Sequence, residues 1–97
     1  MVIRADGCEL PSQDANVDVE LLDDAGRRWS ATFFTLANVA SLMARWQQSG
    51  EYGGGFYFSG GNDAIIVQSL DEDIIHRTVA DLEASGELAH VFTLLED

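Results

Sequence analysis

The sequence contains no lysine, and five arginines are its only permanently cationic side chains. Nucleotide-binding P-loops and Schiff-base enzymes both need a lysine, so neither chemistry is available to this chain. Seventeen aspartate and glutamate residues bring the formal net charge to −12. Binding to nucleic acids or anionic membranes depends on neutralising phosphates, so we expect no nucleic-acid and no membrane partner. An acidic chain is suited to a basic protein partner, whose approach it accelerates by long-range attraction.

Cysteine and proline are almost absent, since Cys8 and Pro11 are the only ones. A single cysteine cannot form an internal disulfide, which is typical of proteins in a reducing cytoplasm. No apolar run approaches the roughly 20 residues of a membrane span, and Met1–Asp6 lacks the apolar stretch of a signal peptide. We therefore expect a cytoplasmic protein whose 97 residues form a single domain.

The first third of the chain predicts an irregular arm followed by a β-hairpin. Residues 1–15 show no periodicity, although Val2 and Ile3 favour a short strand. Residues 17–22 alternate between apolar and acidic side chains, which is typical of a half-buried strand. Asp23–Gly26 has turn chemistry, and the aromatic and β-branched residues of 28–34 predict the returning strand.

The next segment predicts a helix over residues 36–48. Its apolar side chains recur at helical spacing and indicate a stripe facing the core. Thr35 is suited to cap the first turn, and Gly50 to end the helix. The glycine-rich stretch 50–55 follows a helix and precedes a predicted strand, which is the reverse of a dinucleotide-binding loop, so we interpret it as a plain linker. The stripe comprises Leu36, Val39, Leu42, Met43 and Trp46.

The last third predicts a second hairpin, a second helix and a final strand. Strands are expected at 55–59 and 64–68, joined by a turn at 60–63. Ser69 and Glu72 match a capping box for a helix that continues to about Ala84 and ends at Gly86. Residues 88–95 predict the last strand.

The order of elements from residue 28 to 95 is βαββαβ, which predicts an α+β, two-layer sandwich of the ferredoxin-like kind. Right-handed crossovers would place both helices on one face of the sheet. The additional N-terminal strand at 17–22 forms a hairpin with the first strand of this pattern. It competes for a position beside that strand, so it either displaces the last strand or folds elsewhere.

The sequence offers no constellation that assigns a catalytic, metal or cofactor site. Asp73 and His76 lie one helical turn apart and amount to half a metal site at most. No serine lies in a nucleophile elbow, and the acidic residues fall in turns, caps and open faces where water keeps them ionised. The pattern favours a protein without enzymatic activity and without a cofactor.

We expect partner contacts at the acidic hairpin and on the sheet face opposite the helices. If exposed, a mixed apolar and polar face of this kind is typical of a contact surface. The candidate partner-binding residues are Asp18, Glu20, Asp23, Asp24, Tyr57, Ile66 and Gln68.

In general character the chain resembles the small acidic immunity proteins of bacterial toxin systems. The segments that carry the resemblance are Arg28-Trp29-Ser30-Ala31-Thr32-Phe33-Phe34 and Gly55-Phe56-Tyr57-Phe58, together with the small size and the negative charge. This resemblance implies an inhibitor that occludes a basic toxin, often a nuclease, and it transfers no residue roles.

An alternative is a homodimeric, ferredoxin-like domain that binds a small ligand or acts as an enzyme on an unknown substrate. It would have a pocket between sheet faces or subunits, and it predicts a cavity lined by Tyr57, His90 and Trp29.

Overall fold

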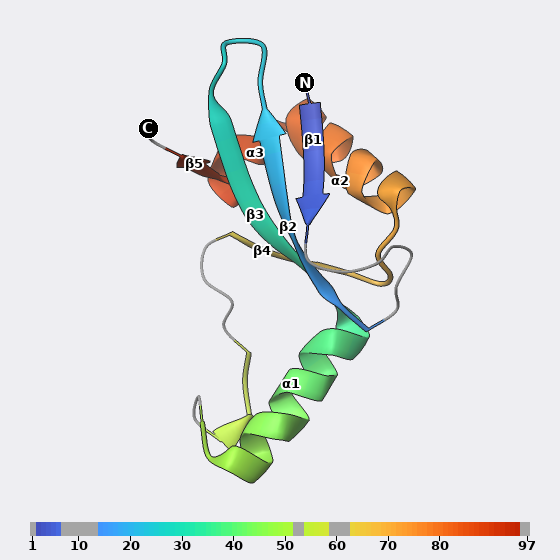
Figure 1. The fold of residues 1–97 in the computed structure, drawn as a ribbon, viewed down its shortest axis with the longest axis vertical. Coiled ribbons are helices and arrows are strands. Elements are labelled where there is room, and N and C mark those ends of the chain that lie inside the picture. Colours follow the sequence, from blue (N-terminus) through green and yellow to red (C-terminus); the bar gives the residue numbers. More distant parts are fainter. Residues whose placement is uncertain (1, 7–13, 52–53, 59–62, 96–97) are drawn as a thin grey trace.

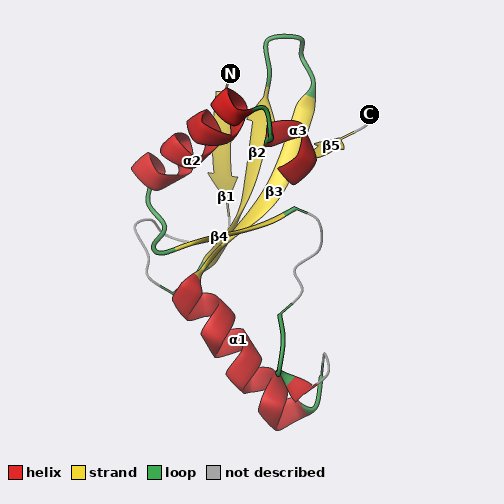
Figure 2. Ribbon diagram, turned by 180° about the vertical axis from the view of Figure 1, so that it is seen from behind, coloured by secondary structure: helices red, strands yellow, loops and turns green. Residues whose placement is uncertain are grey.

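The computed structural model describes residues 2–6, 14–51, 54–58 and 63–95 and confirms the α+β class. Five strands form one mixed sheet, with the order β1-β2-β3-β4 and with β5 pairing β3. Two helices cover one face of the sheet, and a third projects from one end of it (Figures 1 and 2). The elements are β1 (Val2–Asp6), β2 (Asn16–Leu22), β3 (Arg28–Thr35), α1 (Leu36–Ser49), β4 (Ala64–Val67), α2 (Glu72–Ser85), α3 (Leu88–Val91) and β5 (Thr93–Leu95).

The predicted hairpin of β2 and β3 is confirmed, and it forms the centre of the sheet. The two strands pair antiparallel from Asn16↔Phe34 to Leu22↔Arg28. The short strand favoured at Val2 and Ile3 is confirmed, but the prediction of an irregular arm is wrong for residues 4–6, because β1 continues to Asp6 and pairs along its whole length with β2. The alternation of Ile3 and Ala5 is too short to be distinctive in the sequence, and only pairing with β2 reveals it. The rest of the arm up to residue 13, including Cys8, lies outside the described residues.

Two strands share the second edge of β3, and this arrangement resolves the competition expected there. β5 pairs antiparallel with residues 28–30, whereas β4 pairs parallel with residues 32–35. The hairpin partner β2 takes the whole opposite edge. The last strand therefore keeps only three residues of pairing beside β3.

The core lies between the sheet and the pair α2 and α3. Alternation along β2 and β3 points one set of side chains toward α2, as the sequence predicts. Ile75 and Val79 on α2 pack against this set, and Phe33 meets Phe92 edge to face with 6.3 Å between ring centroids. The buried apolar residues of β2 and β3 are Val17, Val19, Leu21, Ala31 and Phe33.

Helix α1 begins and ends as predicted, but its apolar stripe does not face the main core. The Thr35 hydroxyl accepts a hydrogen bond from the amide of Asn38, and Gly50 ends the helix in the left-handed conformation. Val39 is the only buried residue of α1, and Leu36 is 55 % exposed. The expectation of both helices on one sheet face is therefore wrong, because α1 continues the direction of β3 away from the sheet (Figures 1 and 2).

Polar contacts fix the base of α1 to the start of β2. Asp14 accepts hydrogen bonds from the Asn38 side-chain amide at 3.1 Å and from the Ser41 hydroxyl at 3.0 Å. Asn16 donates to the Asn38 side-chain oxygen at 3.0 Å. Hydrogen bonds therefore anchor α1 where apolar packing on the sheet would be expected to do so.

The strand predicted at 55–59 is absent from its described part, residues 55–58. Gly54 and Gly55 both have φ near +80°, which breaks the extended conformation before the aromatic run. The chain turns back along α1, and Phe58 stacks on Trp46 with 5.9 Å between ring centroids. Packing against α1 therefore replaces strand pairing in this segment. Most of the predicted turn at 60–63 lies outside the described residues.

Helix α2 has a different N-cap from the predicted one. The Asp71 carboxylate accepts a hydrogen bond of 2.7 Å from the amide of Ile74, so Asp71 and not Ser69 caps the helix. Leu70 between them is fully buried, which requires the chain to enter the core before the helix begins. A carboxylate at this end also interacts favourably with the helix dipole. The predicted end of the helix at Gly86 is confirmed.

The strand predicted over residues 88–95 is helical in its first half. Leu88 and Val91 lie one helical turn apart in α3 and pack against the core together with Phe92. Only Thr93–Leu95 forms a strand. From β3 onward the described elements read βαβααβ, so the ferredoxin-like arrangement is not confirmed.

Candidate functional site

One face of the sheet carries no helix of the described residues, and this open face is the candidate site. The strands lie in front of α2 and α3 in Figure 1, and behind them in Figure 2. Alternation places the side chains that do not enter the core on this open face. On β2 and β3 these include Asp18, whose carboxylate accepts a hydrogen bond of 3.0 Å from the Thr32 hydroxyl. Ile66 of β4 lies on the same face beside Phe34 and is 48 % exposed.

A shallow hollow on the open face surrounds Glu20. It has a volume of about 220 Å³ and is lined by Val2, Arg4, Glu20, Leu22 and Arg28. A guanidinium nitrogen of Arg28 lies 3.6 Å from the Glu20 carboxylate, and Arg4 is its cross-strand neighbour. The negative charge of Glu20 is therefore largely balanced within the protein, and the apolar rim of Val2 and Leu22 is the part left for contact.

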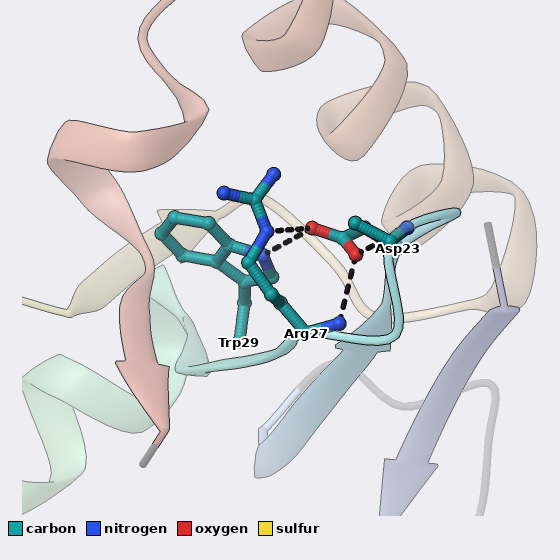
Figure 3. Close-up of polar contacts among 4 residues, drawn as sticks. Asp23, Arg27 and Trp29 are labelled. Atoms are coloured by element: carbon teal, nitrogen blue, oxygen red, sulfur yellow. Dashed lines mark hydrogen bonds and ion pairs between the residues drawn. The ribbon is translucent and has the colours of Figure 1, made fainter.

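The side chain of Asp23 is hydrogen-bonded within the β2–β3 turn. Its carboxylate accepts hydrogen bonds from the Trp29 indole at 3.1 Å, from the backbone amides of Ala25 and Arg27 at 2.9 Å, and from the Arg27 guanidinium at 2.9 Å (Figure 3). The Trp29 hydrogen bond, followed by those from Arg27 and Ala25, lowers the pKa of Asp23 from 3.8 to about 2. The turn itself thus uses the hydrogen-bonding capacity of this predicted contact residue.

The structure divides the seven predicted contact residues among four places. Asp18, Glu20 and Ile66 share the open face, and Asp23 and Asp24 lie in the hairpin turn, where Asp24 is exposed. Tyr57 lies beside α1 and is 48 % exposed. Gln68 lines a wider hollow of about 620 Å³ beside α2, together with Ile74, Arg77, Thr78, Ala80 and Asp81.

Within one chain, the described residues do not bring Tyr57, His90 and Trp29 together around one cavity. Tyr57 belongs to the segment at the far end of α1, whereas α3, which carries His90, lies at the other end of the molecule (Figure 1). Trp29 lies at the start of β3 and contacts Asp23. The structure thus separates Tyr57 from the other two residues.

Within the described ranges, no three histidine, cysteine, aspartate or glutamate side chains come together as a group that could hold a metal ion. Asp73 forms, with His76, the pair that the sequence suggested as half a metal site. Its carboxylate lies 3.7 Å from the guanidinium of Arg77. None of the described helices combines the length and the apolar character needed to cross a bilayer.

An aromatic cluster beside α1 is the feature that the sequence did not predict. Phe58 contacts Phe34 edge to face at 5.1 Å and stacks on Trp46 at 5.9 Å, measured between ring centroids. Gly55 permits this packing, because a Cβ there would collide with the carbonyl oxygen of Met43. The signal in the sequence was the pair of glycines directly before the aromatic run, which indicates close backbone approach.

No protein-family model, curated protein or solved structure matches this chain. The sheet face, the charge and the exposed side chains are therefore the features of this protein that bear on its function.

Proposed function

We propose that this protein is a non-enzymatic binding module that docks a basic partner protein on the open face of its sheet. The observation that carries the proposal is that face itself, which no described helix covers (Figure 1) and which combines apolar and acidic side chains. Ile66 and the rim of Val2 and Leu22 supply apolar area, and Asp18 supplies charge. Apolar contact with a few charged groups around it is typical of protein interfaces.

The charge of the whole chain supports a basic partner. A net charge of −12 on 97 residues attracts a basic protein over a long range and repels acidic ones. An immunity-type inhibitor, which occludes a basic toxin, has this character and is the form of the proposal that the resemblance favours. Binding is expected to weaken as salt is added, since salt screens the attraction.

Affinity capture with the purified chain from the source cells tests the proposal, followed by binding measurements with the captured protein. The double variant Asp18→Asn with Ile66→Ser alters the open face, and asparagine retains an oxygen that can accept the Thr32 hydrogen bond. The matched control is Asp81→Asn with Leu94→Ser, which removes the same charge and a comparably exposed apolar side chain elsewhere.

We expect a basic protein to be captured, and the open-face variant to bind it about 10-fold or more weakly, which corresponds to roughly 1.4 kcal/mol. The control variant should retain wild-type affinity within about 3-fold, since distant surface charges affect encounter more than contact. Equal losses in both variants, or a captured partner that is acidic, would contradict the proposal. Turnover of a small substrate by the chain alone would favour the enzymatic alternative.

A further inference from the structure

The negative charge is distributed unevenly along the chain. Residues 29–62 carry one arginine and one glutamate, Arg45 and Glu51, and are neutral overall. The other 63 residues carry four arginines and sixteen carboxylates, and therefore the entire net charge of −12. The neutral part includes most of β3, the whole of α1 and the segment 54–58 beside it. We call residues 36–51 together with residues 54–58 the α1 lobe, which carries Arg45 and Glu51 and is neutral overall.

The α1 lobe projects from the sheet and leaves large apolar side chains in water. It forms one end of a molecule that measures 45 × 27 × 24 Å (Figures 1 and 2). Phe56 is 78 % exposed and Tyr57 is 48 % exposed, and their rings meet edge to face at 4.9 Å. Leu36 at the base of the helix is 55 % exposed. These are three of the seven large apolar side chains that are exposed among the described residues.

The lobe holds its shape without a partner, so its apolar surface is preorganised. Trp46 stacks on Phe58, the carboxylate of Asp14 and the side chain of Asn16 fix the base of α1, and Gly55 closes against the helix backbone. A preorganised apolar surface lowers the entropy cost of association. Large exposed apolar groups of this kind are typical of protein contact sites.

Charge indicates which partner covers the lobe. Two copies of this chain repel each other wherever their acidic surfaces meet, since each carries −12. In the lobe Arg45 offsets the charge of Glu51. Asp14 at the base of α1 is hydrogen-bonded to Asn38 and Ser41. The lobe is therefore the part of one copy that meets the same part of another with the least repulsion. A symmetric dimer requires a surface complementary to itself, and a neutral apolar surface satisfies this condition whereas an acidic one does not. A basic foreign protein is attracted to the acidic remainder of the chain instead.

We propose that the α1 lobe is a self-association surface, through which two copies of the chain form a symmetric dimer with Phe56, Tyr57 and Leu36 at the contact. This inference does not depend on the basic partner, because Phe56, Tyr57 and Leu36 are not among the open-face residues, although the lobe meets that face where Phe58 contacts Phe34. The two proposals also respond oppositely to salt. Salt screens the repulsion between two acidic copies and strengthens the dimer, whereas it weakens attraction to a basic protein.

Sedimentation equilibrium of the full chain tests the proposal between about 10 mM and about 1 M salt, a range over which the Debye length falls from roughly 30 Å to roughly 3 Å. We expect a monomer–dimer equilibrium whose dissociation constant falls about 10-fold or more with added salt. Phe56→Ser should raise that constant about 10-fold or more. Leu94→Ser, which alters an exposed leucine on β5 outside the lobe, should leave it within about 3-fold, because scattered surface apolar groups contribute little.

Circular dichroism of Phe56→Ser establishes that any loss of dimer is not a loss of fold. If that variant does not fold, Tyr57→Ser replaces it in the same measurement. A monomer at every salt and protein concentration would overturn the proposal. So would a dimer that weakens with salt, or one that Leu94→Ser disrupts and the lobe variants do not.

Discussion

The indole N–H of Trp29 donates a hydrogen bond of 3.1 Å to the Asp23 carboxylate across the β2–β3 turn. The Arg27 guanidinium lies over the Trp29 ring at 5.7 Å and also reaches that carboxylate (Figure 3). Ala25, Arg27 and Trp29 thus all donate hydrogen bonds to the one ionised carboxylate of Asp23. The negative charge of Asp23 therefore helps to hold the β2–β3 hairpin at the centre of the sheet, which makes this turn sensitive to acid.

Acid should weaken the turn over a defined pH range. The pKa of Asp23 is about 2 in the folded chain and 3.8 for an ordinary aspartate. A lowered pKa means that the ionised carboxylate stabilises the fold above pH 3.8, and that this contribution is lost as the pH falls toward 2. In an NMR titration we expect the Trp29 indole proton to shift with a midpoint near 2.

The variant Asp23→Asn provides the control for that titration. Asparagine has no carboxyl group to titrate. In this variant the Trp29 indole proton should therefore show no shift between pH 3.8, the ordinary pKa of aspartate, and pH 2, close to the lowered pKa of Asp23. A wild-type midpoint at the ordinary value would show that the hydrogen bond does not hold the carboxylate ionised.

The position of the α2 N-cap predicts different costs for two nearby substitutions. Asp71→Ala should lower the free energy of unfolding by about 1 kcal/mol, because it removes the acceptor for the Ile74 amide. Ser69→Ala should change it by less than about 0.5 kcal/mol, as is usual for a substitution away from such features. Urea unfolding measures both. A larger cost for Ser69→Ala would place the cap where the capping-box pattern predicted it.

Gly54 and Gly55 share a left-handed conformation but differ in their surroundings. Alanine at either position should cost about 1 kcal/mol or more for that conformation. Only at Gly55 does the added Cβ also meet the α1 backbone, at the Met43 carbonyl oxygen and 2.9 Å from the Gln47 amide nitrogen. Gly55→Ala should therefore cost about 1–3 kcal/mol more, by analogy with overpacking elsewhere.

Local probes separate these two variants. In Gly55→Ala, hydrogen exchange along α1 should accelerate and Trp46 fluorescence should change, because residues 54–58 no longer fit against the helix. Gly54→Ala should keep both signals near those of the wild type, since nothing lies within 4 Å of its Cβ position. Identical behaviour of the two variants would mean that the close approach is not required.

Burial separates two phenylalanines that both lie in segments predicted as strands, Phe33 in 28–34 and Phe56 in 55–59. Phe33→Ala should lower the free energy of unfolding by about 3–5 kcal/mol, since the ring is fully buried against Phe92. Phe56→Ala should change it by less than about 0.5 kcal/mol, because the ring is 78 % exposed. Thermal unfolding at low protein concentration, where association does not contribute, measures both. A large cost for Phe56→Ala would indicate that its ring is buried within one chain.

Local rules predicted the hairpin and the limits of α1 well. Alternation in residues 17–22 and the turn residues at 23–26 require no distant partner, and the structure confirms them. The caps at Thr35, Gly50 and Gly86 are equally local. The same reasoning predicted the exposed acidic residue Asp18 and the apolar Ile66, which do lie on the open face.

The sequence by itself determined the acidic charge, the α+β class, the central hairpin, both limits of α1 and the C-terminal end of α2, since short-range periodicity and capping specify these. Tertiary structure alone decided where those pieces lie. Burial of Leu70 set the start of α2, and packing of Leu88 and Val91 made a short helix from an apparent strand. Contact with α1 turned the Phe56–Phe58 run away from the sheet and left Phe56 exposed in a neutral lobe. Apolar side chains satisfy several local patterns equally well, so the choice among them depends on which distant surface is available for burial.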